Sequence, residues 1–238
     1  MPAVIKNLLI VNILLFLASI GLGSAANIDL TRYLGLYYFR SELFYPYQLI
    51  SHMFMHADFS HVFFNMFALW MFGAVLENHW GGKRFLIYYL ICGLGAAGLQ
   101  LGVAYIEVLR TTAAMDNESI EYAVSYGADA IMQGKNFVHP QMAKLNALYH
   151  VPMIGASGAV FGVLLAFGMT FPNSLVYIFF AIPMKAKYLV IIYGLAELYF
   201  GVMNLPGDNV AHFAHLGGMI FGFFLIRYWK KKDKSRWR

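Results

Sequence analysis

Long apolar stretches alternate with shorter polar ones along this chain of 238 residues. A membrane-crossing helix needs roughly 20 mostly apolar residues to pass a hydrocarbon core about 30 Å thick. Six segments fit this description or come close to it, although two fall short in length: 4–22, 60–76, 85–105, 157–171, 187–203 and 215–229. The pattern therefore predicts an all-α fold, a polytopic membrane protein built as a bundle of six transmembrane helices.

The polar stretches define the connections between these helices. Residues 107–153 form the longest of them, and apolar periodicity over 120–132 predicts a helix there. Because this stretch is longer than an ordinary connecting turn, we expect an insertion outside the cytoplasm that caps the membrane face. Composition also predicts a turn at 204–209 and a basic cytoplasmic tail at about 230–238. We expect a single membrane domain over residues 1–238.

Composition and charge support a membrane protein and indicate its orientation. Hydrophobic residues make up 60% of the chain and charged residues only 12%, far from the balance of a soluble domain. If the N-terminus is cytoplasmic, twelve of the 17 Lys and Arg residues lie inside, and five lie outside: Arg32, Arg40, Arg110, Lys135 and Lys144. The positive-inside rule then puts both termini in the cytoplasm, and we expect a bacterial inner membrane. The net charge of +5 is thus a topology signal, and we expect a lipid bilayer rather than nucleic acid as partner.

One glycine-rich stretch, 155–162, opens an apolar helix with the sequence GASGAVFG. The hydroxyl of Ser157 has little crowding around it, and backbone N–H groups at the start of a helix have no partner within that helix. Such free donors stabilise a developing negative charge. Gly158 and Gly162 also form the small-residue step that is typical of closely packed membrane helices. Packing is the better interpretation when this stretch is considered alone.

Three histidines lie within ten residues at the start of the second helix, where polar groups are costly. His61 and Asn65 are four residues apart and share one helix face, so they point at one place. His52 and His56 have a spacing that suits zinc, but no HExxH glutamate lies between them. We therefore expect structural hydrogen bonds for these two residues, and no metal.

Helix lengths predict which polar groups lie at the same depth. From Ser157 to the end of its helix, and from His215 to the end of the last one, the rise is about 21 Å in each case. If both helices end at the inner surface, Ser157 and His215 lie level, with His61 slightly nearer the outside. Polar side chains at one depth within the membrane must line a water-filled cavity rather than face lipid.

A nucleophile and a base in one wet pocket make an acyl-transfer site. We expect Ser157 as nucleophile and His215 as general base, with the oxyanion held by the Ser157 N–H, His61 and Asn65. Phe161, one turn after Ser157, is placed to pack against the imidazole.

His215 is preferred over His212 as the base because Gly218 and Gly222 share its helix face and allow close helix approach. No acid is obviously paired with His215, which predicts a dyad rather than a triad. Glu197 lies in an apolar helix, and the sequence assigns it no role.

These motifs together resemble the rhomboid family of intramembrane serine proteases, close to its bacterial six-helix form. The matching elements are GxSG at 155–158, HxxxN at His61 and Asn65, AHxGG at 214–218 with Gly222, and Glu77 followed by Gly81. They span about three quarters of the chain.

The resemblance implies roles for the matching residues. Ser157 and His215 match the family's catalytic dyad, and His61 and Asn65 match its oxyanion-stabilising pair, with Gly155 beside them on the substrate-binding side. The implied reaction is cleavage of a peptide bond in or beside a transmembrane helix of a single-span membrane protein, without a cofactor. Two departures are visible: Tyr47-Gln48 stands where the family often has Trp-Arg, and the insertion at 107–153 is longer than in the minimal form.

Two other functions fit parts of the pattern. A rhomboid-like protein that binds membrane clients without cleaving them would lack the nucleophile or the base, but Ser157 and His215 are both present. A small transporter would use intramembrane His and Asn as its pathway. Other intramembrane proteases are disfavoured, since the chain has no HExxH motif and no pair of aspartates within apolar helices.

Overall fold

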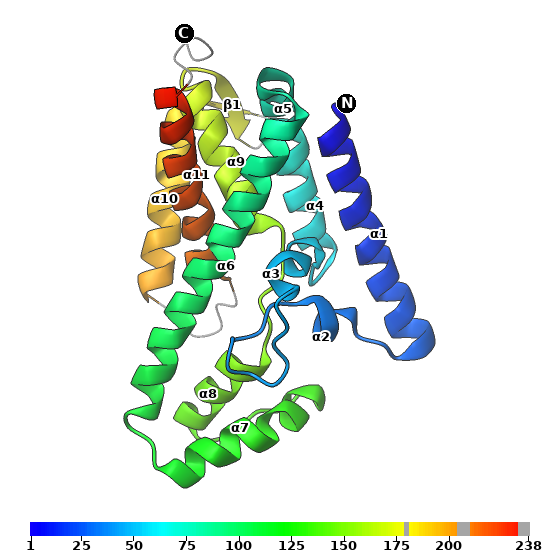
Figure 1. Cartoon of the computed structure of the whole chain (residues 1–238), viewed down its shortest axis with the longest axis vertical. Coiled ribbons are helices and arrows are strands. Elements are labelled where there is room, and N and C mark those ends of the chain that lie inside the picture. The colour runs from blue at the N-terminus through cyan, green and yellow to red at the C-terminus, as the bar shows by residue number, and fades with distance from the viewer. Residues whose placement is uncertain (179–180, 204–209, 233–238) are drawn as a thin grey trace.

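The computed structural model describes residues 1–178, 181–203 and 210–232, and these are mostly helical (Figure 1). The predicted turn at 204–209 and the end of the basic tail, 233–238, lie outside the described residues. In chain order the elements are α1 (Ala3–Ala26), α2 (Leu30–Leu34), α3 (Gln48–Ser51), η1 (His52–Phe54), α4 (Phe59–Ala68), η2 (Leu69–Gly73), α5 (Ala74–Trp80), α6 (Gly82–Thr112), α7 (Asn117–Met132), α8 (Pro140–His150), α9 (Ser157–Thr170), β1 (Leu175–Ile178), β2 (Ile182–Lys185), α10 (Ala186–Met203) and α11 (His212–Lys232).

The helices form a bundle of the kind expected for an integral membrane protein. Among the described residues, four stretches are long and apolar enough to cross a membrane: Ala3–Ala26, Phe59–Trp80, Gly82–Thr112 and Ala186–Met203. Helix α9 is a shorter apolar helix, and α11 is not among the four. The predicted all-α membrane bundle is confirmed. The predicted count of six crossings is not confirmed, since by length and composition four stretches of the described residues qualify.

One short sheet interrupts the helical pattern. Strands β1 and β2 pair antiparallel between α9 and α10, with Val176 opposite Met184. The sequence analysis predicted only a connection here. Pro172 ends the preceding helix, and the β-branched and aromatic residues that follow favour an extended backbone, so a hairpin forms.

Helix α9 lies in the middle of the bundle because its small residues let neighbouring backbones approach. A Cβ added to Gly218 of α11 would overlap the backbone of Gly158, and one added to Gly162 would lie 3.0 Å from the Gly218 carbonyl oxygen. From α6, the Tyr88 hydroxyl donates to the Gly162 carbonyl at 2.8 Å. The small-residue faces expected on α9 and α11 therefore contact each other, and they bring the N-terminal ends of both helices together.

Helix α1 is tied to the bundle by Glu77 in the middle of α5. The two Glu77 carboxylate oxygens accept the N–H groups of Val4 and Ile5 at 2.9 and 2.8 Å. These N–H groups belong to the first turn of α1, where no carbonyl of the helix can reach them. The buried carboxylate also complements the positive end of the helix dipole.

The two ends of the bundle differ (Figure 1). The start of α1, the end of α11 and the β1–β2 hairpin lie at one end, and α7 and α8 lie at the other. Helix α6 continues beyond the predicted span to Thr112, and a second apolar cluster joins its end to α7 and α8 through Val108, Ala123 and Leu145. The polar stretch after α6 is therefore a pair of packed helices rather than a loose loop.

The segment before α3 is organised by Gln48, one of the two positions that depart from the family pattern. Its side chain is fully buried. It donates to the Leu43 carbonyl at 2.9 Å and accepts the Tyr45 N–H at 3.1 Å. A neutral amide thus holds this loop by satisfying backbone groups on both sides of one turn.

Candidate active site

Ser157 and His215 meet where α9 and α11 begin. The Ser157 Oγ lies 2.8 Å from the His215 Nε2, which is a hydrogen-bonding distance for a hydroxyl and an imidazole. Ser157 is half-buried, and His215 is 8% exposed. The two side chains come from separate helices, 58 residues apart in sequence, and they lie at the same level as the helix rise predicts.

The imidazole of His215 is held on one face by Phe161. The two rings stack with their centroids 4.2 Å apart and their planes 5° from parallel. Phe161 lies one turn after Ser157 on α9, so the helix that carries the hydroxyl also orients the imidazole plane. This is the packing that the sequence predicts for Phe161.

Glu197 of α10 contacts both histidines at the start of α11, and it was the residue that sequence reasoning missed. Its Oε2 lies 2.9 Å from the His215 Nδ1 and 2.6 Å from the His212 Nδ1. The expectation that no acid pairs with His215 is therefore wrong. The available signal was a lone carboxylate in an otherwise apolar helix, which needs a buried partner. The sequence did not reveal which partner, because α10 and α11 are separate helices and neither segment by itself shows which faces meet.

His61 and Gly155 face each other beside Ser157. Asp58 caps α4 by accepting the His61 N–H at 2.8 Å, and this cap places His61 in the first turn. The His61 Nδ1 lies 3.4 Å from the Ala57 N–H and accepts it, which leaves Nε2 as the protonated nitrogen. A Cβ added to Gly155 would lie 2.8 Å from His61 Nε2 and 3.5 Å from Ser157 Oγ. The missing side chain of Gly155 thus leaves a space between an imidazole N–H and the serine hydroxyl.

The backbone at Gly155 explains why glycine stands there. Its φ of 123° lies in a region that side chains rarely adopt, and its N–H donates to the His52 carbonyl at 2.9 Å. The first N–H that bonds within α9 is that of Val160, which donates to the Ala156 carbonyl at 3.0 Å. The N–H of Ser157 therefore lies ahead of the helix's own hydrogen bonds, beside the space left by Gly155.

Asn65 is positioned less directly. It lies one turn after His61 on α4 and is 7% exposed. Its Nδ2 donates to the His61 carbonyl at 2.9 Å, and among the described residues this is the side-chain bond that it makes. The structure brings Asn65 to His61, and no hydrogen bond joins Asn65 to Ser157 among the described residues.

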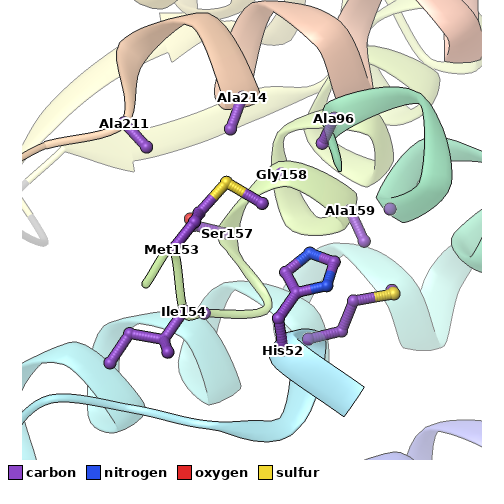
Figure 2. Close-up of a pocket in the computed structure, with 12 residues that line it drawn as sticks. His52, Ala96, Met153, Ile154, Ser157, Gly158, Ala159, Ala211 and Ala214 are labelled. Carbon is purple, nitrogen blue, oxygen red and sulfur yellow. The ribbon is translucent and has the colours of Figure 1, made fainter. Parts of the chain in front are cut away.

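A small cavity opens beside the first turn of α9 (Figure 2). Figure 2 shows Ala211, just before α11, and Ala214 of α11 on one side of it and His52 on the other. Most of its lining is small or unbranched: His52, Met53, Gly93, Ala96, Met153, Ile154, Gly155, Ser157, Gly158, Ala159, Ala211 and Ala214. Ser157 therefore lies at the edge of a hollow and not in close-packed core.

His52 lines this cavity, and the His56 ring lies against that of His61, with the ring centroids 4.9 Å apart. His52 is 2% exposed, its Nδ1 lies 2.8 Å from the Gln48 carbonyl, and burial lowers its pKa to about 4. Burial, together with the nearby His61, also lowers the pKa of His56 to about 4. The structural hydrogen bond predicted for His52 is present. His56 makes no hydrogen bond of good geometry among the described residues, although the Phe54 backbone lies near enough to its ring to oppose the fall in its pKa.

A group of side chains with the donor set for a metal ion occurs once among the described residues, at Glu197, His212 and His215. The sequence analysis considered a different pair, His52 and His56. The N···O separations of 2.6 and 2.9 Å at Glu197 are those of charge-assisted hydrogen bonds. A zinc ion bonded to each atom at about 2.0–2.2 Å would require these atoms to move apart. Hydrogen bonding accounts for the arrangement as it stands.

Comparison with known proteins places this site in a family. The rhomboid domain model matches residues 44–232, which is most of the chain and includes every residue of the site described above. Rhomboid protein 1, mitochondrial, of Saccharomyces cerevisiae is 27% identical over 195 residues, covering 79% of this chain and 44% of that protein. RHOMBOID-like protein 12, mitochondrial, of Arabidopsis thaliana is 26% identical over 192 residues, covering 80% of this chain and 47% of that protein.

A bacterial relative carries a protease name. Rhomboid protease GluP of Bacillus subtilis is 26% identical over 184 residues, which cover 75% of this chain and 25% of that protein. The chain thus spans less than half the length of these three relatives. The match nevertheless covers the helices that carry the serine, the histidines and Glu197. The chain belongs to the rhomboid family.

Proposed function

We propose that this protein is an intramembrane serine endopeptidase in which Ser157 is the nucleophile and His215 is the general base. The observation that carries the proposal is the 2.8 Å contact between Ser157 Oγ and His215 Nε2. A serine hydroxyl is a weak nucleophile until a base takes its proton, and this contact provides that path. Membership of a family that includes Rhomboid protease GluP supports the same reaction.

The reaction then follows the usual course of acyl transfer. Ser157 Oγ attacks the carbonyl carbon of the scissile peptide bond, and its proton passes to His215 Nε2. The carbonyl oxygen becomes an oxyanion in the space next to Gly155, which is bounded by His61 Nε2 and Ser157 Oγ, and its proposed donors are the Nε2–H of His61 and the N–H of Ser157. His215 gives the proton to the leaving amine as the C–N bond breaks, and an acyl ester remains on Ser157.

Water completes the cycle. His215 takes a proton from a water molecule as the water oxygen attacks the ester carbonyl, and it returns this proton to Ser157 Oγ as the ester bond breaks. The products are a carboxylic acid and the regenerated hydroxyl. In this proposal Asn65 supports the oxyanion site through His61, to whose carbonyl its Nδ2 donates at 2.9 Å.

The setting of the reaction is also part of the proposal. The substrates are single-span membrane proteins that are cut in or beside their transmembrane helix. The protein forms one membrane domain over residues 1–238 in a bacterial inner membrane, with both termini in the cytoplasm. The basic last turn of α11, Lys230 to Lys232, lies at the same end of the bundle as the start of α1, which supports this orientation (Figure 1).

The test uses purified protein in detergent with a panel of single-span membrane proteins, and mass spectrometry maps the fragments. We expect wild type to cut at least one substrate, and Ser157→Ala and His215→Ala each to abolish the cut without unfolding the protein. A fluorophosphonate probe should label wild type and not Ser157→Ala. Equal labelling of both would contradict the assignment of the nucleophile, and stable substrate binding without cleavage would indicate a client-binding protein.

A further inference from the structure

Glu197 occupies a position that the proposed reaction leaves unexplained, and the inference drawn from it rests on the proposed function. We propose that Glu197 is a positioning residue: its carboxylate keeps His215 in the tautomer that can accept the Ser157 proton, and His212 holds the carboxylate in place. The site is then a triad of serine, histidine and glutamate, whose members come from α9, α11 and α10.

The hydrogen bonds at Glu197 determine which ring nitrogen of His215 carries the proton. An ionised carboxylate only accepts hydrogen bonds, so an Nδ1 that lies 2.9 Å from Glu197 Oε2 must be the donor. In a neutral imidazole the other nitrogen is then unprotonated. His215 Nε2, 2.8 Å from Ser157 Oγ, is therefore free to accept the hydroxyl proton.

Phe161 does not perform this selection. Its ring lies against the face of the His215 imidazole, with the planes 5° apart, and it fixes the plane of the ring. A stacked hydrocarbon ring offers no hydrogen-bond acceptor to Nδ1, so it does not distinguish between the two tautomers. The selection therefore depends on the carboxylate at the edge of the imidazole.

The surroundings show that this carboxylate is held where it is. Glu197 is 9% exposed, and the other buried residues of α10 are apolar: Ala186, Leu189 and Val190. A buried carboxylate is tolerated only when it is paired. The His212 Nδ1 supplies a second bond to the same oxygen at 2.6 Å, and the His212 ring stacks on Phe200 of α10 with centroids 5.8 Å apart. His212 thus connects the start of α11 to the turn of α10 that carries Glu197.

The same contact matters when His215 becomes charged. After His215 has taken the Ser157 proton, both of its nitrogens carry hydrogen and the ring is a cation. A carboxylate 2.9 Å from Nδ1 stabilises that cation, and the imidazole need not rotate for this to happen. Glu197 therefore acts on the histidine throughout the cycle and contacts neither the substrate nor the reacting carbonyl.

The experiment compares Glu197→Gln and Glu197→Asp with wild type in the same detergent and on the same substrate. Loss of the carboxylate should lower kcat by up to about 10⁴-fold, the loss seen when the acid of a serine protease triad is replaced by its amide. KM should change by less than about threefold, because Glu197 does not touch the substrate. Glu197→Asp, which keeps the charge, should recover part of the loss. His212→Asn should lower kcat less than Glu197→Gln does.

Two controls separate this inference from the proposed function. Ser157→Ala gives the background rate of the assay, and Glu121→Gln changes an exposed glutamate of α7, in the pair of helices at the end of the bundle away from the β1–β2 hairpin (Figure 1). Glu121→Gln should cut like wild type. If wild type cuts and Glu197→Gln cuts within about threefold of its kcat, only the role of Glu197 is wrong. If Ser157→Ala cuts as fast as wild type, the proposed function is wrong as well.

A second measurement does not depend on turnover. In ¹⁵N-histidine-labelled protein, the His215 signals are identified by their loss in His215→Ala. We expect Nδ1 to give the shift of a protonated ring nitrogen and Nε2 that of an unprotonated one, with the distinction weakened in Glu197→Gln. This holds even if Glu197→Gln is too unstable to assay. A wild-type spectrum with the proton on Nε2 would overturn the inference.

Discussion

Replacing Gly155 with alanine tests the space in which the oxyanion is proposed to form. The added Cβ would lie 2.8 Å from His61 Nε2, 2.9 Å from His61 Cε1 and 3.5 Å from Ser157 Oγ. The first two distances are closer than carbon and imidazole atoms tolerate, so the His61 ring must move away. The methyl group then fills the position that the carbonyl oxygen of the substrate would take.

Two separate costs follow from this change. Alanine at a φ of 123° strains the backbone by about 1–3 kcal/mol, which lowers stability. Loss of one oxyanion donor lowers kcat by about 10²- to 10³-fold, or about 3–4 kcal/mol of transition-state stabilisation. Because the methyl group also takes up the space itself, we expect Gly155→Ala to lose activity at least to this extent.

The assay measures cleavage of a single-span substrate in detergent, with each rate divided by the folded fraction obtained from a thermal melt. Gly134→Ala is the matched control. Gly134 also has a positive φ, of 67°, but a Cβ there would meet nothing within 4 Å. This control should lose some stability and keep the wild-type rate per folded molecule.

A double variant tests whether the methyl group of Gly155→Ala lowers the rate by filling the oxyanion space beside His61 or only by straining the backbone. If His61 acts at the oxyanion, Gly155→Ala combined with His61→Ala should be no slower than the slower single variant, because both changes remove one function. Cleavage by Gly155→Ala within about threefold of wild type, per folded molecule, would refute the placement of the oxyanion. Losses that simply multiply in the double variant would show that His61 and Gly155 act independently.

Two further predictions concern stability. Glu77→Ala removes the acceptor of the Val4 and Ile5 N–H groups and should destabilise the protein by about 1.5–3 kcal/mol in an unfolding titration, whereas a loss below about 0.5 kcal/mol would contradict the role of Glu77 in holding α1. His52 has a pKa of about 4 when folded and an ordinary value near 6.5, so between these pH values the unfolded chain binds a proton that the folded chain does not. Stability should therefore fall as the pH is lowered through this window, by at most about 1.4 kcal/mol per pH unit from this residue, and the slope should be shallower in His52→Gln. An unchanged slope would show that His52 does not contribute.

The start of α9 could be predicted from local sequence. Gly155 and Gly158 flank Ser157, and Pro172 limits the helix, so both the uncrowded hydroxyl and the short length follow from nearby residues. The equal depth of Ser157 and His215 follows from the same kind of reasoning, because helical rise relates position in the chain to depth in the membrane. Phe161 needs only the helical period to lie one turn away on the same face.

Other parts of the fold depend on contacts that local sequence does not contain. The β1–β2 hairpin forms because two short segments pair with each other. Neither segment has an alternation of apolar and polar residues long enough to predict a strand. The loop around Gln48 is held by one amide that binds backbone groups on both sides of a turn. Asn65 shares a face with His61 as the helical period predicts, but its bond to the His61 carbonyl became apparent only in the folded chain.

The sequence by itself determined the membrane bundle, the serine at the head of a short helix and the histidine level with it, because composition and helical rise are properties of single segments. Only the tertiary structure decided that Glu197 pairs with His215 and His212, and that Gly155 leaves a space beside His61. The rotation of α10 about its own axis determines whether its acid faces lipid or imidazole. That rotation depends on packing against α9 and α11, and no single segment of the sequence contains it.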